Sequence, residues 1–225
     1  MAKILVFNNA SNKMETYIRG ENDRMPYNVG NTLTVREFRA RSKSNLLWTD
    51  RTTMETWNQF RKFYGSSIPV GACFKRIWEG GHGKQSQHYA GTAFDVGQRL
   101  PVAQREKLRK AAHDFKRWSY VEPKSISPTW VHMDKRFGTP ACSAGYPVLK
   151  FGSRGNYVLI LQDALNALGF ITGAPDGIFG TKTMNEVKAM QRAYSLPQTG
   201  VVNCNTWQAV VNRVVGLGKT ATVIG

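Results

Sequence analysis

Two imidazoles and one carboxylate, spread over distant stretches, constrain how this chain can fold. His88 and Asp95 flank a glycine-containing segment, and His132 follows much later within Trp130-Val131-His132-Met133-Asp134. The glycine can bend the backbone so that His88 and Asp95 converge on one point. If the later segment returns beside them, the three side chains form a ligand set that zinc favours, with a fourth position left for water.

Length and composition exclude some classes of protein. The 225 residues suffice for one large or two ordinary domains. No stretch approaches the roughly 20 apolar residues of a membrane span, so we expect no membrane insertion. The short apolar run at residues 4–7 predicts a first β-strand rather than a secretory signal. Delivery to a target outside the membrane would then need another route.

The formal net charge of +16 favours an anionic polymer as partner, such as nucleic acid, anionic lipid or bacterial cell wall. The basic residues are scattered and form no nucleic-acid-binding motif, so we expect no nucleic-acid partner. Three cysteines without CxxC spacing predict reduced, buried thiols rather than disulfides or a thiolate zinc cluster. They are Cys73, Cys142 and Cys204.

A small, proline-flanked segment divides the chain in two. Residues 141–147 contain Gly145 and have the composition of an exposed linker. Residues 1–140 mix strand and helix patterns, with helices expected near 54–63 and 101–118 and strands near 67–74 and 130–134. Residues 148–215 show three amphipathic helices, with Thr183 and Asn205 as expected caps. The prediction is an α+β domain, then a small all-α three-helix domain, and a tail at 216–225.

The second half resembles the type 1 peptidoglycan-binding domain, a three-helix domain of cell-wall hydrolases. The resemblance covers about 65 residues and is most specific in the turn Asp176-Gly177-Ile178-Phe179-Gly180. Further matches include Gly152, Leu161-Gln162, Gln191, Thr199-Gly200 and Thr206-Trp207. The resemblance implies that bacterial peptidoglycan is the partner.

The first half resembles zinc peptidases of the D-alanyl-D-alanine carboxypeptidase and L-alanyl-D-glutamate peptidase group. The matching stretches are residues 34–38, 70–76, 86–88, 91–95 and the Trp-x-His-x-Asp motif at 130–134. The resemblance implies that His88, Asp95 and His132 hold Zn²⁺. It also implies that an arginine or lysine of the pair Lys75-Arg76 binds the developing oxyanion or a substrate carboxylate.

The general base is left open. Better-known members have a glutamate three residues before the last histidine, where this chain has Thr129. Asp134 is the nearest carboxylate and could be the base or could orient His132 through a hydrogen bond. Glu122 is the second candidate for the base. His82, in a glycine-rich loop, is either a substrate contact or without a role.

These features together predict a monomeric zinc peptidase that cuts stem peptides of the bacterial wall and is held there by its C-terminal domain. Without a leader, release by lysis or through phage-type membrane holes fits best. We expect residues 1–147 alone to cleave soluble stem peptide. The alternative is a non-catalytic wall-binding protein with structural zinc.

Overall fold

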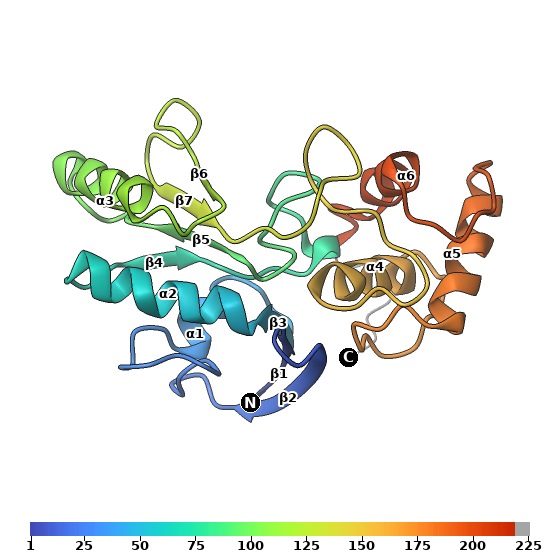
Figure 1. The fold of residues 1–225 in the computed structure, drawn as a ribbon, viewed down its shortest axis with the longest axis horizontal. Helices are drawn as coiled ribbons and strands as arrows, with labels where there is room; N and C mark the ends of the chain where they lie inside the picture. Colours follow the sequence, from blue (N-terminus) through green and yellow to red (C-terminus); the bar gives the residue numbers. More distant parts are fainter. Residues whose placement is uncertain (219–225) are drawn as a thin grey trace.

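The protein, described for residues 1–218 by a computed structural model, consists of an α+β region and a helical region packed side by side (Figure 1). The α+β region contains two small sheets. The first has the order β2-β1-β3, with β1 antiparallel to β2 and parallel to β3. Its strands are β1 (Ala2–Asn8), β2 (Lys13–Arg19) and β3 (Leu46–Asp50).

The second sheet is antiparallel throughout and has the order β4-β5-β7-β6. The predicted strand at 130–134 is confirmed, whereas the one expected at 67–74 is paired over only three residues. Between β4 and β5 lies a long segment with one short 3₁₀ helix and several turns. The elements are β4 (Val70–Ala72), η1 (Ile77–Glu79), β5 (Ala93–Val96), β6 (Tyr120–Val121) and β7 (Val131–Asp134).

Three helices complete this region: α1 (Val35–Arg39), α2 (Arg51–Tyr64) and α3 (Val102–Phe115). Thr34 caps α1, because its side chain accepts from Glu37 N while the Glu37 carboxylate accepts from Thr34 N. This reciprocal pair satisfies two backbone donors that a helix start leaves free. Helix α3 ends at Phe115, three residues before the predicted end at Trp118, and the following residue, Lys116, has a φ of 55°.

The helical region consists of α4 (Asn156–Ala167), α5 (Thr181–Ala193) and α6 (Cys204–Val214), so the three predicted helices are present. Two predicted caps are wrong. Asn203, not Asn205, caps α6 through a bond from Thr206 N. Thr183 lies inside α5, where its hydroxyl accepts from Gln162. Of the predicted tail, residues 219–225 lie outside the described part of the chain.

Helix α4 lies on the side of the helical region that faces the first region (Figure 1), and every one of its twelve residues is buried. A helix that is buried all round needs partners on every side. Its apolar side chains pack with α5 and α6, while it also contacts β3 and η1 of the first region. Polar residues of α4 are therefore buried at an interface instead of facing water.

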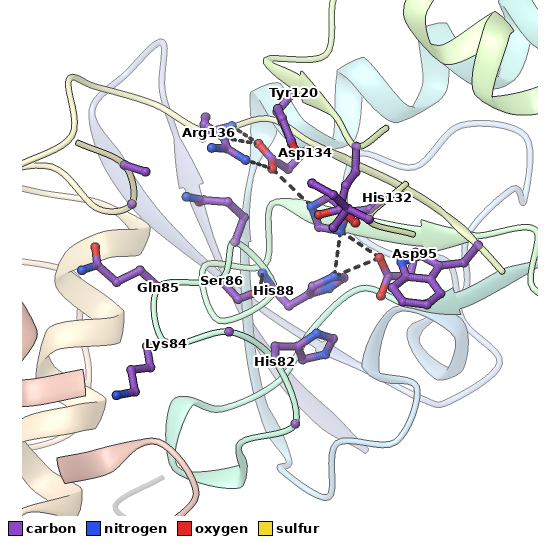
Figure 2. Close-up of a pocket in the computed structure, with 18 residues that line it drawn as sticks. His82, Lys84, Gln85, Ser86, His88, Asp95, Tyr120, His132, Asp134 and Arg136 are labelled. Carbon is purple, nitrogen blue, oxygen red and sulfur yellow. Dashed lines mark hydrogen bonds and ion pairs between the residues drawn. The ribbon is translucent and has the colours of Figure 1, made fainter. Parts of the chain in front are cut away.

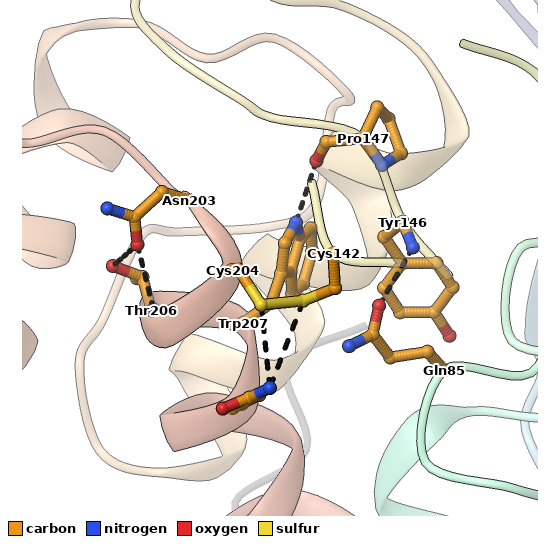
Figure 3. Close-up of a disulfide and its surroundings, with 9 residues drawn as sticks. Gln85, Cys142, Tyr146, Pro147, Asn203, Cys204, Thr206 and Trp207 are labelled. Carbon is orange, nitrogen blue, oxygen red and sulfur yellow. Dashed lines mark hydrogen bonds between the residues drawn. A yellow bond between two sulfur atoms is a disulfide. The ribbon is translucent and has the colours of Figure 1, made fainter. Parts of the chain in front are cut away.

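The segment predicted as an exposed linker is packed into this interface over most of its length, and only Ser143 and Ala144 are exposed. Tyr146 is fully buried, and its ring lies 5.0 Å from that of Trp207. Figure 3 shows the disulfide between Cys142 and Cys204, which ties this segment to α6 across 62 residues. The prediction of reduced thiols is thus wrong for these two cysteines, whereas Cys73 is a buried free thiol.

Candidate metal centre and pocket

The three predicted ligands meet at one point, on a face of the four-stranded sheet over its two central strands (Figure 2). Asp95 on β5 and His132 on β7 are paired residues in the antiparallel register, so their side chains share a face. His88 reaches the same point from the long segment before β5. Gly91 makes the turn between them: its φ is +67°, and a Cβ there would lie 1.9 Å from the Trp48 carbonyl oxygen.

The ligand atoms form a small triangle. His88 Nε2 lies 3.2 Å from Asp95 Oδ1, Asp95 Oδ1 lies 2.8 Å from His132 Nδ1, and the two nitrogens are 3.3 Å apart. Ligand atoms 2.0–2.1 Å from a tetrahedral zinc lie about 3.3 Å from one another. The spacing therefore suits one small metal ion.

Outer partners set which nitrogen of each imidazole faces this point. His88 Nδ1 lies 2.9 Å from the Cys73 carbonyl oxygen, to which it can only donate, and this leaves Nε2 with a lone pair. His132 Nε2 lies 3.3 Å from Asp134 Oδ2, and donation to that carboxylate would leave the lone pair on Nδ1, the nitrogen that faces Asp95 and His88. Such outer hydrogen bonds are the usual way in which proteins orient metal-binding histidines.

The electrostatics of the site call for a positive charge at its centre. Burial alone would lower the pKa of His132, but hydrogen bonds to Asp134 and Asp95 outweigh it and raise that pKa to about 9. Burial would raise the pKa of Asp95, but hydrogen bonds from His132 and His88 hold it below its ordinary value. The donor set therefore fits a zinc ion, which would supply this charge.

A pocket of about 620 Å³ opens beside the three ligands. His82 lies at its wall with its ring stacked on His88, the centroids 4.1 Å apart. Burial, followed by the neighbouring His88, lowers the pKa of His82 to about 3, so this imidazole is neutral. Its ring nitrogen is also close enough to His88 and Asp95 to join a ligand group. The loop histidine that the sequence left open thus belongs to the site.

Asp134 is fully buried at the back of the pocket and is bound by Arg136. The Arg136 Nε donates to Asp134 Oδ1 at 2.8 Å, and the guanidinium lies 4.5 Å from the centre of the Tyr120 ring. Burial opposes ionisation of Asp134, but Arg136 and then His132 lower its pKa below the ordinary value. With both oxygens engaged, Asp134 is placed to orient His132.

Glu122 follows β6 and lies on the side of His132 opposite to Asp95, since β7 is between β5 and β6. Its backbone N–H donates to the His132 carbonyl oxygen at 2.9 Å, which continues the pairing of β6 with β7 by one residue. Asp95, His132 and Glu122 thus form a row across neighbouring strands. Glu122 lines the pocket, and its carboxylate forms no hydrogen bond or ion pair with any of residues 1–218.

The structure does not bring Arg76 into the pocket, so its predicted role as a substrate clamp is wrong here. Arg76 is 1% exposed and binds Asp163 of α4 through two hydrogen bonds, of 2.9 and 2.6 Å. Lys75 does not line the pocket either, because its amine donates to the Gly80 carbonyl oxygen. The cations that do line it are Lys84 and Arg136.

Sequence reasoning missed Arg136, although a signal was present. His132, Asp134 and Arg136 are spaced by two, as expected for side chains on one face of an extended segment. Tyr120 was also missed. It becomes recognisable only when the register of β6 and β7 places it opposite Asp134.

Comparison with known proteins identifies the helical region. Residues 154–210 match the family described as a putative peptidoglycan binding domain. The resemblance predicted for the second half is confirmed there. Two curated spore cortex-lytic enzymes of Bacillus cereus are each 36% identical over 64 residues, which is 28% of this chain.

The chain spans about a quarter of the length of these curated relatives. A solved structure described as the SleB N-terminal domain is 34% identical and covers 30% of this chain and 92% of its own, with a TM-score of 0.29. No helix within residues 1–218 has the length and apolar character needed to span a membrane.

Proposed function

We propose that this protein is a zinc-dependent peptidase that cuts stem-peptide bonds of bacterial peptidoglycan. The observation that carries the proposal is the triangle of lone-pair atoms from His88, Asp95 and His132 beside an open pocket. The peptidoglycan-binding match of residues 154–210 supplies the substrate class. The similarity to spore cortex-lytic enzymes is consistent with a lytic role at the wall.

Zinc held by these three side chains would polarise a peptide carbonyl and lower the pKa of a bound water towards about 7. Glu122 is the pocket carboxylate free to take a proton from that water. It is half-buried, unpaired within the described chain, and one strand away from His132. Asp134 holds the His132 imidazole in the orientation in which Nδ1 faces the centre.

Two cationic side chains among the residues that line the pocket could contact an anionic group of the substrate. Arg136 and Lys84 line the cavity, and Lys84 lies near the helical region, where its amine donates to Asn212 at 2.6 Å. Stem peptides carry carboxylates, which such cations attract. Binding of the wall by residues 154–210 would raise the local concentration of scissile bonds at the pocket.

The test is mass spectrometry of fragments released from purified walls, together with zinc content. His88→Ala should abolish both bound zinc and peptide cleavage, while His113→Ala, a change on α3 outside the pocket, should alter neither. Glu122→Gln should keep zinc and lose about 10²–10⁴ in rate. Asp134→Asn should weaken zinc binding about 10- to 100-fold.

Two results would overturn the proposal: peptide release that survives His88→Ala, or fragments cut only at glycosidic bonds. Zinc binding and wall binding without any cleavage would instead support the alternative, a non-catalytic wall-binding protein. If Asp134→Asn loses activity but keeps its zinc, and Glu122→Gln stays active, then Asp134 and not Glu122 is the general base.

A further inference from the structure

The segment that carries His88 is held by the peptidoglycan-binding side of the molecule. We define residues 84–92 as the metal loop; it has no helix or strand before β5 and depends on turns for its own hydrogen bonds. Each of the four residues before His88 is hydrogen-bonded to the connecting segment or to the helical region. These four residues are Lys84, Gln85, Ser86 and Gln87.

Tyr157, in the first turn of α4, makes the most deeply buried of these contacts. Its hydroxyl donates to Gln87 Oε1 at 2.9 Å and accepts from the Phe137 backbone N–H at 3.2 Å. Gln87 is 3% exposed, and Thr92 is its other side-chain partner, at 3.3 Å. The Gln87 carbonyl oxygen accepts from Thr92 N and Ala90 N, which closes the turn around His88.

Tyr146, in the connecting segment, holds the preceding residues. Its hydroxyl donates to the Ser86 carbonyl oxygen, and its backbone N–H donates to Gln85 Oε1, both at 2.8 Å. The approach is so close that a Cβ on Gly145 would lie 2.0 Å from Gln85 Oε1. The Cys142–Cys204 disulfide fixes the same segment to α6 (Figure 3).

The metal loop is also part of the apolar core of the helical region. Tyr89 and Ala90 are fully buried in the cluster formed by Tyr146, Tyr157 and Trp207 with the three helices. The loop therefore lies between two packed surfaces, with the ligand side of His88 towards the sheet and its backbone against α4 and the connecting segment.

From these contacts we infer that the peptidoglycan-binding domain is a structural part of the metal centre, with Tyr157 and Tyr146 as positioning residues for the metal loop. The two halves are then not a catalytic domain and a wall-binding domain that work independently of each other. The inference rests on the proposed function where it concerns catalysis, and on the contacts alone where it concerns the loop.

The experiment compares Tyr157→Phe and Tyr146→Phe in the full chain with Tyr194→Phe, a tyrosine of the same region that packs on Phe170 and Arg213 away from the loop. Each change removes one hydroxyl and leaves the ring. Amide hydrogen exchange of residues 87–92 is measured without metal. Zinc affinity and the kcat and KM for a soluble stem peptide are measured beside it.

Losing one buried hydrogen bond should raise exchange in residues 87–92 and lower zinc affinity and kcat by about 3- to 10-fold. We expect KM within about twofold, wall binding intact, and no effect of Tyr194→Phe. A merely structural role would lower the melting temperature but leave kcat and zinc affinity of the folded protein unchanged.

Exchange, zinc affinity and kcat that match wild type in both variants would overturn the inference, whether or not the protein is a peptidase. If the two variants exchange faster but the wild-type protein binds no zinc, the positioning role is supported and the proposed function is refuted. If exchange in the two variants is unchanged but the wild-type protein has an activity that His88→Ala abolishes, the proposed function is supported and the positioning role is refuted.

Discussion

The buried ion pair between Arg76 and Asp163 gives the sharpest test of how the two regions are joined. Both side chains are almost without solvent contact, at 1% and 2% exposed, and the guanidinium also donates to Ser44 Oγ. It lies 5.1 Å from the centre of the Trp48 ring. Breaking one partner of such a pair leaves a buried charge without compensation, which costs about 3–5 kcal/mol.

We therefore expect Arg76→Met and Asp163→Asn each to lower the free energy of unfolding by about 3–5 kcal/mol. For a chain of this size that corresponds to about 6–20 °C in melting temperature. The double variant should recover much of the loss, because no unpaired charge remains and the Asn oxygen can still accept from Trp78 Nε1. A coupling of about 2 kcal/mol or more between the two changes is the expected result.

Urea unfolding followed by tryptophan fluorescence measures this cycle, and Lys110→Met is the matched control. That change breaks an exposed i,i+4 pair on α3 and should alter stability little. If the protein is a peptidase as proposed, the folded double variant should cleave at the wild-type rate, because Arg76 lies outside the pocket. Single variants whose free energy of unfolding falls by less than about 1 kcal/mol would refute the structural role. Arg76→Met with normal stability and a cleavage rate lowered about 10²- to 10³-fold would instead support the predicted role of Arg76 in binding a substrate carboxylate.

Two further predictions concern stability. Burial raises the pKa of Asp50 to about 6, so its folded form binds a proton more readily than the unfolded chain. The stability that protonated Asp50 contributes should therefore fall by about 2 kcal/mol as pH rises from about 4 to about 6. Asp50→Asn should flatten this slope in urea unfolding at several pH values; parallel curves would contradict it. Reducing the Cys142–Cys204 disulfide, which closes 62 residues, should cost about 2–4 kcal/mol. The Cys142→Ser/Cys204→Ser variant should then be insensitive to reductant, and equal stability with and without reductant in wild type would refute the estimate.

Local sequence patterns predicted most elements and the convergence of His88, Asp95 and His132. His88 and Asp95 are joined by a turn that needs Gly91, and His132 lies on an alternating strand, so the direction of each side chain depends on short-range geometry. The capping box at Thr34 and Glu37 is likewise a contact between near neighbours. These features could be predicted because each is encoded within a few residues, apart from the return of β7 beside β5.

Features that depend on distant partners could not be predicted. Alternation assigns a face to Lys75 and Arg76 only if the strand continues, but β4 ends at Ala72, and the partner of Arg76 lies 87 residues away. The same holds for Cys142 and Cys204, 62 residues apart. Neither partner carries a local signal of its own.

Helix α4 shows the physical reason most clearly. Its apolar stripe predicted one buried face, and the polar residues between were expected to face water. They are instead buried against complementary groups of the first region: Asn156 donates to Asp50, Tyr157 to Gln87, and Asp163 accepts from Arg76. Buried polar groups are stable only when paired, so these contacts require the sheet region to be present. The polar face of α4 is therefore specific to this neighbour, and the helix that resembles a wall-binding element also completes the surface on which the metal loop rests.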